Sequence, residues 1–487
     1  MKRLSELVRG IPCTVEGNKD VEIKGLAFHS AQAKPGFLFV AVPGFRVSGS
    51  EFIDDAINRG AVAVATDDIR NVRKNWVTVI VTGSPRRFLA QIANRFFDFP
   101  ARKLELVGVT GTNGKTTTTY LLRSMAGAAG RRTGLVGTIE YSDGQETWPA
   151  AQTTPESLDF VRLLERMVAN GVEVCAAEVS SHALELDRVF DLDFRAAVFT
   201  NLSQDHLDFH RSLRAYRDAK LRLFDGLAPT STAVVNIDDP VGHDVLGVTR
   251  ARRITFGTRD DLAEQPDVLG SVRAVRADGL ELAVRAGGAE HAVRLKLIGR
   301  HNLMNLLAAW GVGLALGWEP DAMIAGAEAL ECVPGRLEPV PLDRPFRVFV
   351  DYAHTPEALE RVLETVREFT RGRVIAVFGA GGDRDREKRP LMGRAVAARA
   401  DVAVVTSDNP RSEPPDSIIA AIVAGMSNGC EQLVEPDRRE AIGRALKLAR
   451  AGDTVVVAGK GHEDYQLVGN ERRDFDDRRV VRELLEG

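Results

Sequence analysis

A glycine-rich turn at residues 110–117 limits what this chain can fold into more than any other stretch. It follows the short apolar run 104–109 and precedes 117–127, a segment whose sequence can continue as a helix. A strand–turn–helix unit of this kind points backbone N–H groups and the positive end of a helix dipole at an anion. Lys115 would reach the β- and γ-phosphates of a nucleotide, and the Thr116 hydroxyl would ligate Mg²⁺. The stretch therefore predicts a site for a nucleoside triphosphate such as ATP.

The turn is a variant of the usual phosphate-binding pattern. The spacing G-x-x-x-x-G-K-[ST] places a glycine at position 109, where this chain has Val109. An ordinary strand–turn–helix connection is the alternative, but Gly-Lys-Thr-Thr after a β-like run is far more specific than a lone glycine pattern. The residues of the turn that we expect to contact the nucleotide are Gly111, Thr112, Asn113, Gly114, Lys115, Thr116 and Thr117.

The length of 487 residues exceeds what one hydrophobic core usually supports. We expect three domains, at residues 1–101, 102–333 and 334–487. Each contains short apolar runs separated by helix-compatible stretches, which predicts an α/β fold. The first domain would be a small α/β module and the second a mostly parallel sheet that carries the phosphate loop. The third would be a separate Rossmann-like sheet.

The positions of the β-like runs support this division. In the first domain they lie at 36–42, 61–65 and 76–81, and in the third at 347–350, 374–378, 402–406 and 454–457. Between residues 258 and 298, Asp-Gly and Gly-Gly turn signals predict an antiparallel excursion from the parallel sheet. A Pro-Gly pair at 334–335 marks the linker to the third domain.

The composition limits which partners the protein can have and in which cellular compartment it can work. The chain is 44% hydrophobic and 27% charged with a formal net charge of -4, which gives no reason to expect nucleic acid or an anionic membrane as a partner. No apolar run approaches the roughly 18 residues of a membrane helix, and the N-terminal segment lacks a signal peptide's apolar region. The four cysteines form no C-x-x-C pair, which argues against a zinc knuckle and fits a reducing compartment. We expect a cytoplasmic protein without membrane insertion.

Two strand ends in the second domain carry candidates for a magnesium–phosphate centre. Glu178 ends the apolar run 172–178, and His206 lies in the polar stretch that follows the run 196–201. A magnesium ion needs oxygen ligands beyond the Thr116 hydroxyl, so Glu178 is the leading candidate and His206 a rarer nitrogen ligand. Zinc is disfavoured because the histidine spacing fits none of the usual zinc patterns. Helix caps or plain surface polarity are the alternative for the stretch around His206.

Polar loops also follow the strands expected in the third domain. They lie at residues 351–356, 379–385, 407–412 and 459–463. Arg384, Arg411 and Glu463 at one sheet edge would suit a zwitterionic ligand, with the arginines binding carboxylates and the glutamate an ammonium group. The glycines at 379–382 lack the G-x-G-x-x-G spacing, which disfavours a nicotinamide dinucleotide.

Taken together, these features resemble the Mur ligases, the family that adds amino acids to the nucleotide-linked peptidoglycan precursor. The resemblance covers essentially the whole chain. Its most specific marks are the segments 111–117, 178–182, 201–206, 351–356 and 459–463. Two further segments, Gln-Thr-Thr-Pro at 152–155 and Asp-Asn-Pro-Arg at 408–411, resemble the branch of the family that adds meso-diaminopimelate.

The resemblance implies roles for residues that spacing alone would not single out. The UDP end of the acceptor would contact Ser30, Phe45, Arg46 and Val47, and its muramoyl-dipeptide would contact Gln152, Thr153, Thr154, Ser180 and Arg188. ATP would also contact Asn305, Arg336 and Asp351. The incoming amino acid would contact Arg384, Asp408, Asn409, Pro410, Arg411, Gly459 and Glu463. Leu186 departs from the pattern, because some relatives place a glutamine there.

The resemblance also implies that Lys220 is carbamylated. By itself this lysine would be a solvated residue on a helix, but a carbamate is an anion and can ligate a second Mg²⁺ where an ammonium group would repel it. The implied catalytic residues are Lys115, Glu178, His206 and Lys220. The implied metal ligands are Thr116, Glu178, His206 and Lys220.

The activity implied by the resemblance is that of an ATP-dependent amide ligase, acting as a monomer. It would join meso-diaminopimelate to UDP-N-acetylmuramoyl-L-alanyl-D-glutamate through an acyl phosphate. Three alternatives remain open. A closely similar enzyme would add L-lysine instead, and a folylpolyglutamate synthase-like ligase would not need the N-terminal module. A nucleotide-dependent switch protein would need the triphosphate site but no amino-acid pocket.

Overall fold

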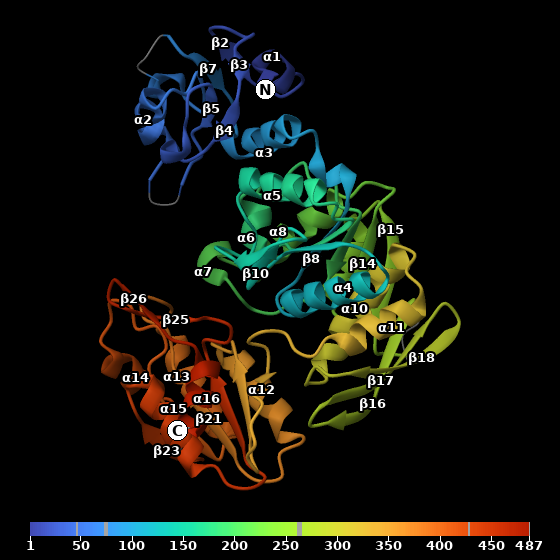
Figure 1. The fold of residues 1–487 in the computed structure, drawn as a ribbon, viewed down its shortest axis with the longest axis vertical. Coiled ribbons are helices and arrows are strands. Elements are labelled where there is room, and N and C mark those ends of the chain that lie inside the picture. The colour runs from blue at the N-terminus through green and yellow to red at the C-terminus, as the bar shows by residue number, and fades with distance from the viewer. Residues whose placement is uncertain (45–46, 73–75, 261–264, 427–428, 487) are drawn as a thin grey trace. The chain divides into compact units, whose positions relative to one another are not determined.

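The computed structural model describes residues 1–44, 47–72, 76–260, 265–426 and 429–486 (Figure 1). It divides into two compact units. Unit 1 comprises Met1–Leu269 with Asn305–Gly326, and unit 2 comprises Gly270–Met304 with Ala327–Gly487. Parallel sheets flanked by helices dominate both units, which confirms the predicted α/β class. The boundaries at residues 101 and 333 stay a prediction.

The N-terminal part of unit 1 contains a five-stranded sheet. Its strands, in spatial order, are β2 (Thr14–Glu16), β7 (Thr78–Val81), β6 (Ala63–Thr66), β5 (Phe37–Val40) and β4 (Gly25–Ala27). Beside it lie the small ladder and the helices of this part, namely β1 (Lys2–Arg3), β3 (Glu22–Ile23), α1 (Leu4–Leu7), α2 (Ile53–Asn58) and α3 (Pro85–Phe96). Each of the three β-like runs expected here forms a strand, because its small and branched side chains are buried.

Helix α3 packs against α5 (Ser157–Ala169), and the two helices lie side by side in Figure 1. Leu158 and Val161 of α5 belong to the same buried cluster as Leu89 and Ile92 of α3. Apolar residues recur at helical spacing along α5, so one of its faces completes the core of the N-terminal module. The core of the N-terminal module is therefore completed by a helix from outside it.

The rest of unit 1 is built on parallel strands. In spatial order they are β9 (Thr133–Val136), β12 (Val174–Glu178), β8 (Glu105–Thr110), β13 (Ala196–Phe199), β14 (Thr232–Asn236) and β15 (Arg252–Gly257). The short strands β10 (Glu140–Ser142) and β11 (Thr147–Pro149) extend this sheet antiparallel beyond β9. Its helices are α4 (Lys115–Ala128), α6 (Ser181–Glu185), α7 (Leu207–His210), α8 (Leu213–Asp225), α9 (Val241–Val248), α10 (His301–Ala315) and α11 (Pro320–Ala329). The phosphate loop joins β8 to α4, as the sequence predicted.

The antiparallel excursion is also present. The three strands are β16 (Val268–Arg276), β17 (Gly279–Ala286) and β18 (Ala289–Leu295). The turns between them fall at the two predicted turn signals, and β17 pairs with β18 antiparallel. The first residues of β16, however, pair parallel with β15.

Unit 2 contains the second sheet that we predicted. Its strands, in spatial order, are β19 (Glu338–Pro339), β20 (Arg347–Asp351), β24 (Thr454–Ala458), β21 (Val374–Phe378), β22 (Val402–Val405) and β23 (Glu431–Val434). All but β19 run parallel. The helices are α12 (Pro356–Arg367), α13 (Lys388–Arg399), α14 (Pro415–Val423), α15 (Arg438–Leu448) and α16 (Asp477–Glu486), and a hairpin of β25 (Tyr465–Val468) and β26 (Glu471–Asp474) precedes α16. The polar loops therefore leave this sheet at the carboxyl ends of adjacent parallel strands, where α/β sheets bind ligands.

No helix in the described residues combines the length and apolarity that crossing a membrane requires.

Candidate functional site

The phosphate loop depends on two glycines with positive φ. Gly111 has φ +150° and Gly114 has φ +89°. A Cβ atom on Gly111 would overlap the Thr200 hydroxyl, and one on Gly114 would overlap the side-chain oxygen of Asn305. Only glycine fits both positions, because the backbone is left-handed and the neighbouring atoms leave no room. Helix α4 starts directly after Gly114, so the N–H groups of its first turn have no acceptor within the helix and suit a phosphate.

The loop that follows β13 holds the phosphate loop in shape. Asn201 accepts hydrogen bonds from the Thr112 N–H through its carbonyl at 2.9 Å and from the Asn113 N–H through its side chain at 2.9 Å. The Thr200 hydroxyl donates to the Asn113 carbonyl at 2.6 Å. The first amides of the turn are thus engaged by the protein itself, which leaves the start of α4 as the part suited to bind phosphate.

Two lysines meet at one carbonyl of this loop. Lys115 Nζ donates to the Gly111 carbonyl at 2.9 Å and to the Thr112 carbonyl at 2.8 Å. Lys220 Nζ, on α8, donates to the same Gly111 carbonyl at 2.8 Å and lies 4.4 Å from the centre of the Tyr216 ring. Lys220 is only 1% exposed. Burial, and next the charge of Lys115, hold the pKa of Lys220 well below its ordinary value.

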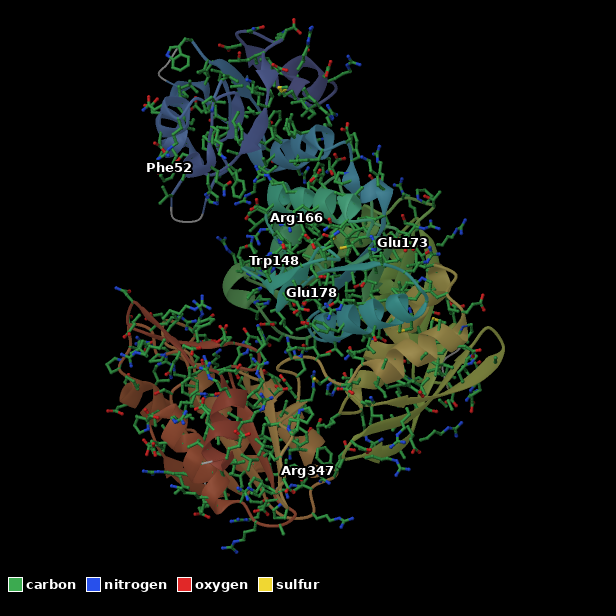
Figure 2. All side chains as sticks on the ribbon, viewed as in Figure 1. Phe52, Trp148, Arg166, Glu173, Glu178 and Arg347 are labelled. Atoms are coloured by element: carbon green, nitrogen blue, oxygen red, sulfur yellow. The ribbon has the colours of Figure 1, made fainter. Side chains whose placement is uncertain are left out.

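Glu178 lies at the end of β12, opposite Val109 on the strand that leads into the phosphate loop. It is 1% exposed and is labelled in Figure 2. Its carboxylate accepts hydrogen bonds from the Thr138 N–H at 2.8 Å and the Thr138 hydroxyl at 3.0 Å. Our sequence analysis did not identify Thr138, because this threonine belongs to no motif and reaches Glu178 only through the pairing of β9 with β12.

The side chains expected to bind a metal only partly converge. Among the described residues, no three histidine, cysteine, aspartate or glutamate side chains form a metal-binding group. Thr116 is buried at the start of α4. His206 is exposed in a left-handed conformation, and its ring lies 4.8 Å from that of His182. The donor set of Thr116 and Glu178 suits an Mg²⁺ that takes its remaining ligands from phosphate and water.

The residues expected to bind the peptide part of the acceptor come together around the main chain of Glu178. The Thr154 hydroxyl donates to the Glu178 carbonyl at 2.8 Å and accepts from the Ser180 N–H at 3.1 Å. The Thr153 and Thr138 hydroxyls are 3.0 Å apart. Glu178 therefore contacts the expected acceptor residue Thr154 through its carbonyl, and its carboxylate is linked to Thr153 through Thr138.

Arg188 connects this cluster to the N-terminal module. Its guanidinium donates to the Gln152 side-chain oxygen and to the Thr154 carbonyl, both at 3.0 Å. It also pairs with Glu156 at 2.9 Å, and Glu156 pairs with Arg86 of α3 at 3.1 Å. The Arg86 guanidinium in turn donates to the Pro43 carbonyl at 2.9 Å. Neither Arg86 nor Glu156 was predicted, because nothing in the sequence indicates that they meet.

The remaining acceptor residues are less closely held. Ser30 begins a 3₁₀ turn and bonds to Asp55, which lowers the pKa of that carboxyl. Val47 is exposed. Phe45 and Arg46 lie outside the described residues. Leu186 ends α6, with its N–H donating to the His182 carbonyl.

Three residues were expected to contact ATP from outside the phosphate loop. Asn305 lies directly beside Gly114. In unit 2, both carboxylate oxygens of Asp351 accept backbone N–H groups, from Leu337 and Ala353, each at 2.7 Å, and burial raises the pKa of Asp351. Arg336 lies with its guanidinium 5.2 Å from the centre of the Tyr352 ring.

In unit 2, Asn409 is the centre of the expected amino-acid site. Its side-chain oxygen accepts from the Leu467 N–H at 2.9 Å and from Lys460 Nζ at 3.2 Å. Its amide nitrogen donates to Glu463 at 2.9 Å, and Lys460 pairs with the same Glu463 oxygen at 3.2 Å. A backbone donor on one side and a carboxylate on the other fix the orientation of the amide. Lys460 lies in the segment 459–463 that our sequence analysis marked, but no role was predicted for it or for Leu467.

The arginines of this site differ in how they are held. Arg411 has φ +52°, and its guanidinium donates to the Gly382 carbonyl at 2.8 Å. Its N–H donates to the Leu467 carbonyl at 3.0 Å, so β25 holds Arg411 through the backbone. Arg384 is exposed, with a longer bond of 3.4 Å to the Asp383 carbonyl. A Cβ atom on Gly459 would overlap the Asp408 carboxylate.

A buried ion pair contacts the backbone at the start of two of these loops. Arg438 and Asp477 are both fully buried and pair at 2.7 Å. The Arg438 guanidinium also donates to the Ser407 carbonyl at 3.3 Å and to the Ala458 carbonyl at 3.0 Å. These carbonyls directly precede Asp408 and Gly459, so the start of α16 is tied to both expected ligand loops.

Comparison with protein families finds three matches in succession along the chain. Residues 22–97 match the model described as Mur ligase family, catalytic domain. Residues 109–313 match the Mur ligase middle domain, and residues 335–461 match the Mur ligase, glutamate ligase domain. Together the three models span most of the chain.

Several relatives that match this chain over nearly its whole length share one name. The UDP-N-acetylmuramoyl-L-alanyl-D-glutamate–2,6-diaminopimelate ligase of Caldanaerobacter subterraneus is 42% identical over 485 residues, which covers 99% of this chain and 99% of the relative. The protein of the same name from Gloeobacter violaceus is 46% identical and covers 99% of this chain and 98% of the relative. A solved structure of a ligase with this name is 31% identical, with a TM-score of 0.71, and covers 100% of this chain and 99% of that one. The chain therefore belongs to the Mur ligase family of ATP-dependent acid–amino-acid ligases.

Proposed function

We propose that this chain joins meso-diaminopimelate to the D-glutamyl carboxylate of UDP-N-acetylmuramoyl-L-alanyl-D-glutamate and converts ATP to ADP and inorganic phosphate. One observation carries the proposal. Glu178 ends β12 opposite Val109, on the strand that leads into the phosphate loop, and the Thr154 hydroxyl binds its carbonyl. A carboxylate bound at Thr154 and Ser180 would therefore lie one strand away from the phosphate loop, which suits its attack on the γ-phosphate of ATP. The names and similarity of the full-length relatives support the same substrates.

The chemistry requires an activated carboxylate, because a free carboxylate has no adequate leaving group. The acceptor carboxylate would attack the γ-phosphorus of ATP, which forms an acyl phosphate and releases ADP. The amine of the amino acid would then attack the acyl carbon, so that a C–N bond forms, inorganic phosphate leaves and a proton is released. Lys115 and the first turn of α4 would stabilise the negative charge on the transferring phosphoryl group. Mg²⁺ held by Thr116 and Glu178 would neutralise phosphate charge.

We propose further that Lys220 is carbamylated in the working enzyme. A carbamate forms from a neutral amine, and the environment of Lys220 favours that form because it is buried beside the Lys115 ammonium. Carbamylation would place a negative charge beside the Lys115 ammonium, which gives an attractive pair of opposite charges. His206 stays a candidate for positioning a ligand or metal at the edge of this site.

The amino-acid specificity depends on unit 2. Arg411 would bind the distal carboxylate of diaminopimelate, Glu463 its distal ammonium, and Arg384 the other carboxylate. L-Lysine lacks that distal carboxylate and would leave Arg411 desolvated without a counter-ion. We also propose that the enzyme works in the cytoplasm, where ATP and nucleotide-linked precursors are made, and that it acts as a monomer.

The test is an amino-acid panel assayed with the UDP-linked dipeptide and ATP. We expect ADP release to require both acceptor and amino acid, and mass spectrometry to detect the product with diaminopimelate added. ADP release without an acceptor would instead support a nucleotide-dependent switch. Product formation with folate and glutamate would support the folylpolyglutamate ligase, and equal use of L-lysine would contradict the specificity assigned here.

A further inference from the structure

The expected ammonium-binding carboxylate in unit 2 already has a cation bound to it. Lys460 has no exposed surface, and its Nζ lies 3.2 Å from Glu463 and 3.2 Å from the Asn409 side-chain oxygen. Glu463 keeps part of its side chain accessible, with 17% exposed. Any ligand ammonium that reaches Glu463 must therefore share the carboxylate with a permanent protein ammonium.

The position of Lys460 is fixed by the surrounding backbone. Asn409 bridges Lys460 to Glu463, and the Leu467 N–H holds Asn409 from the other side. The Lys460 ammonium lies 5.3 Å from the centre of the Tyr465 ring. It therefore cannot move away from Glu463 without losing both polar partners inside the protein, where unpaired charge is unfavourable.

The charges of the site follow from this arrangement. Lys460 balances Glu463, so the two together present no net charge, while Arg411 adds a positive charge and Asp408, beside Gly459, a negative one. A side chain that ends in a lone ammonium group brings a second cation to the carboxylate that Lys460 already occupies. One that ends in both an ammonium and a carboxylate brings its own compensating anion. Like charges brought together in a partly buried site are strongly unfavourable.

We infer that Lys460 is a specificity-determining residue, which rejects amino acids whose side chain ends in an ammonium group alone. The inference rests on the proposed function and extends it. Arg411 favours ligands that carry the distal carboxylate, because it attracts that group. Lys460 disfavours ligands that lack the carboxylate, because it repels their uncompensated ammonium group. Specificity then comes from two opposed effects at one end of the ligand rather than from one attractive contact.

The test compares kcat/KM for meso-diaminopimelate and L-lysine in wild type, Lys460→Met and Lys460→Arg. In Lys460→Met we expect the preference for diaminopimelate to fall by about tenfold or more, with lysine use retained or increased. Lys460→Arg keeps the positive charge and should keep the preference. Arg473→Met is the matched control, because it removes an exposed cation from the neighbouring β26 and should leave both values unchanged.

A second variant covers the case in which Lys460→Met does not fold. Glu463→Gln keeps the Lys460 ammonium but removes its counter-ion, so lysine use should fall more than diaminopimelate use. Thermal unfolding of each variant shows whether it is folded. If Lys460→Met lowers both values equally, or if Glu463→Gln leaves the preference unchanged, Lys460 has only a structural role. A wild type that prefers lysine would overturn the proposed amino-acid specificity as well, which separates the two failures.

Discussion

Lys115 donates to two carbonyls of the phosphate loop and stands at the start of α4. We expect Lys115→Met to fold normally but to turn over more than tenfold more slowly, because the transferring phosphoryl group loses the cation that stabilises its charge. A tenfold loss corresponds to an activation barrier that is higher by about 1.4 kcal/mol. ADP release under saturating substrates measures the loss. Lys103→Met is the control, since Lys103 is exposed before β8. Near-wild-type turnover in Lys115→Met would remove this lysine from the mechanism.

Thr138 donates two hydrogen bonds to the Glu178 carboxylate, one from its backbone and one from its hydroxyl. Thr138→Val keeps the shape and the backbone bond but removes the hydroxyl. We expect a lower kcat and a higher Mg²⁺ concentration for half-maximal activity. The lost hydrogen bond to a charged group is worth about 1.5–3 kcal/mol of interaction free energy. Titration of Mg²⁺ measures the change, and the exposed Thr147→Val is the control. An unchanged Mg²⁺ dependence would mean that Thr138 does not orient a metal ligand.

At the scale of single residues, the sequence predicted the phosphate loop well because its residues are contiguous. Gly111 and Gly114 have the positive φ angles that the pattern implies. Thr138 escaped prediction because it acts on a carboxylate that another strand positions. Lys460 lies in a predicted loop, but its pairing with Glu463 depends on how that loop folds. Asn409 was predicted as a ligand contact, and its amide is engaged by Lys460, Leu467 and Glu463. Whether it also contacts a ligand stays a prediction.

At the scale of secondary-structure elements, strand β25 holds the loop 408–411. The Gln466 side chain donates to the Asp408 carbonyl at 2.7 Å, and Leu467 bonds to Asn409 and Arg411. We expect Gln466→Leu to raise the KM for the amino acid severalfold, because the loop loses a support of about 1 kcal/mol, and to leave the KM for ATP unchanged. Steady-state kinetics with each substrate varied measures both constants. Equal changes in all KM values would indicate a general loss of structure.

The elements themselves followed from local patterns. The runs at 374–378 and 402–406 are uninterrupted apolar stretches, so they could only be buried parallel strands or core helices, and their short length favoured strands. Hairpin β25–β26 was not predicted, because β25 is only half-buried and β26 is exposed and carries mixed charges. Its position beside the loop 408–411 depends on backbone hydrogen bonds that no sequence pattern indicates.

At the scale of the whole molecule, an ion-pair chain links two parts of unit 1. Arg86 bonds to the Pro43 carbonyl and to Glu156, and Glu156 pairs with Arg188. We expect Glu156→Gln to raise the KM for the UDP-linked acceptor by about tenfold, since two partly buried arginines lose their shared anion, and to change the KM for ATP little. Glu146→Gln is the control, because Glu146 pairs only at the surface. An unchanged acceptor KM would mean that the chain serves stability alone.

The α/β class was predictable from the spacing of strand patterns, whereas the contacts that join the elements were not. The division into three domains stays a prediction. Leu158 and Val161 complete the core of the N-terminal module although they lie beyond the predicted boundary at residue 101. Their apolar spacing along α5 shows only that this face is buried. What covers it depends on the three-dimensional path of the chain, which periodicity does not encode.

The pairing of Arg438 with Asp477 bears on the genetics of this protein. A truncation that removes α16 would leave the Arg438 guanidinium without its counter-ion, next to the two ligand loops. Losing one partner of a buried pair typically destabilises by about 3–5 kcal/mol, a large share of a typical folding free energy. Nonsense and frameshift alleles that remove Asp477 should therefore behave as loss-of-function alleles.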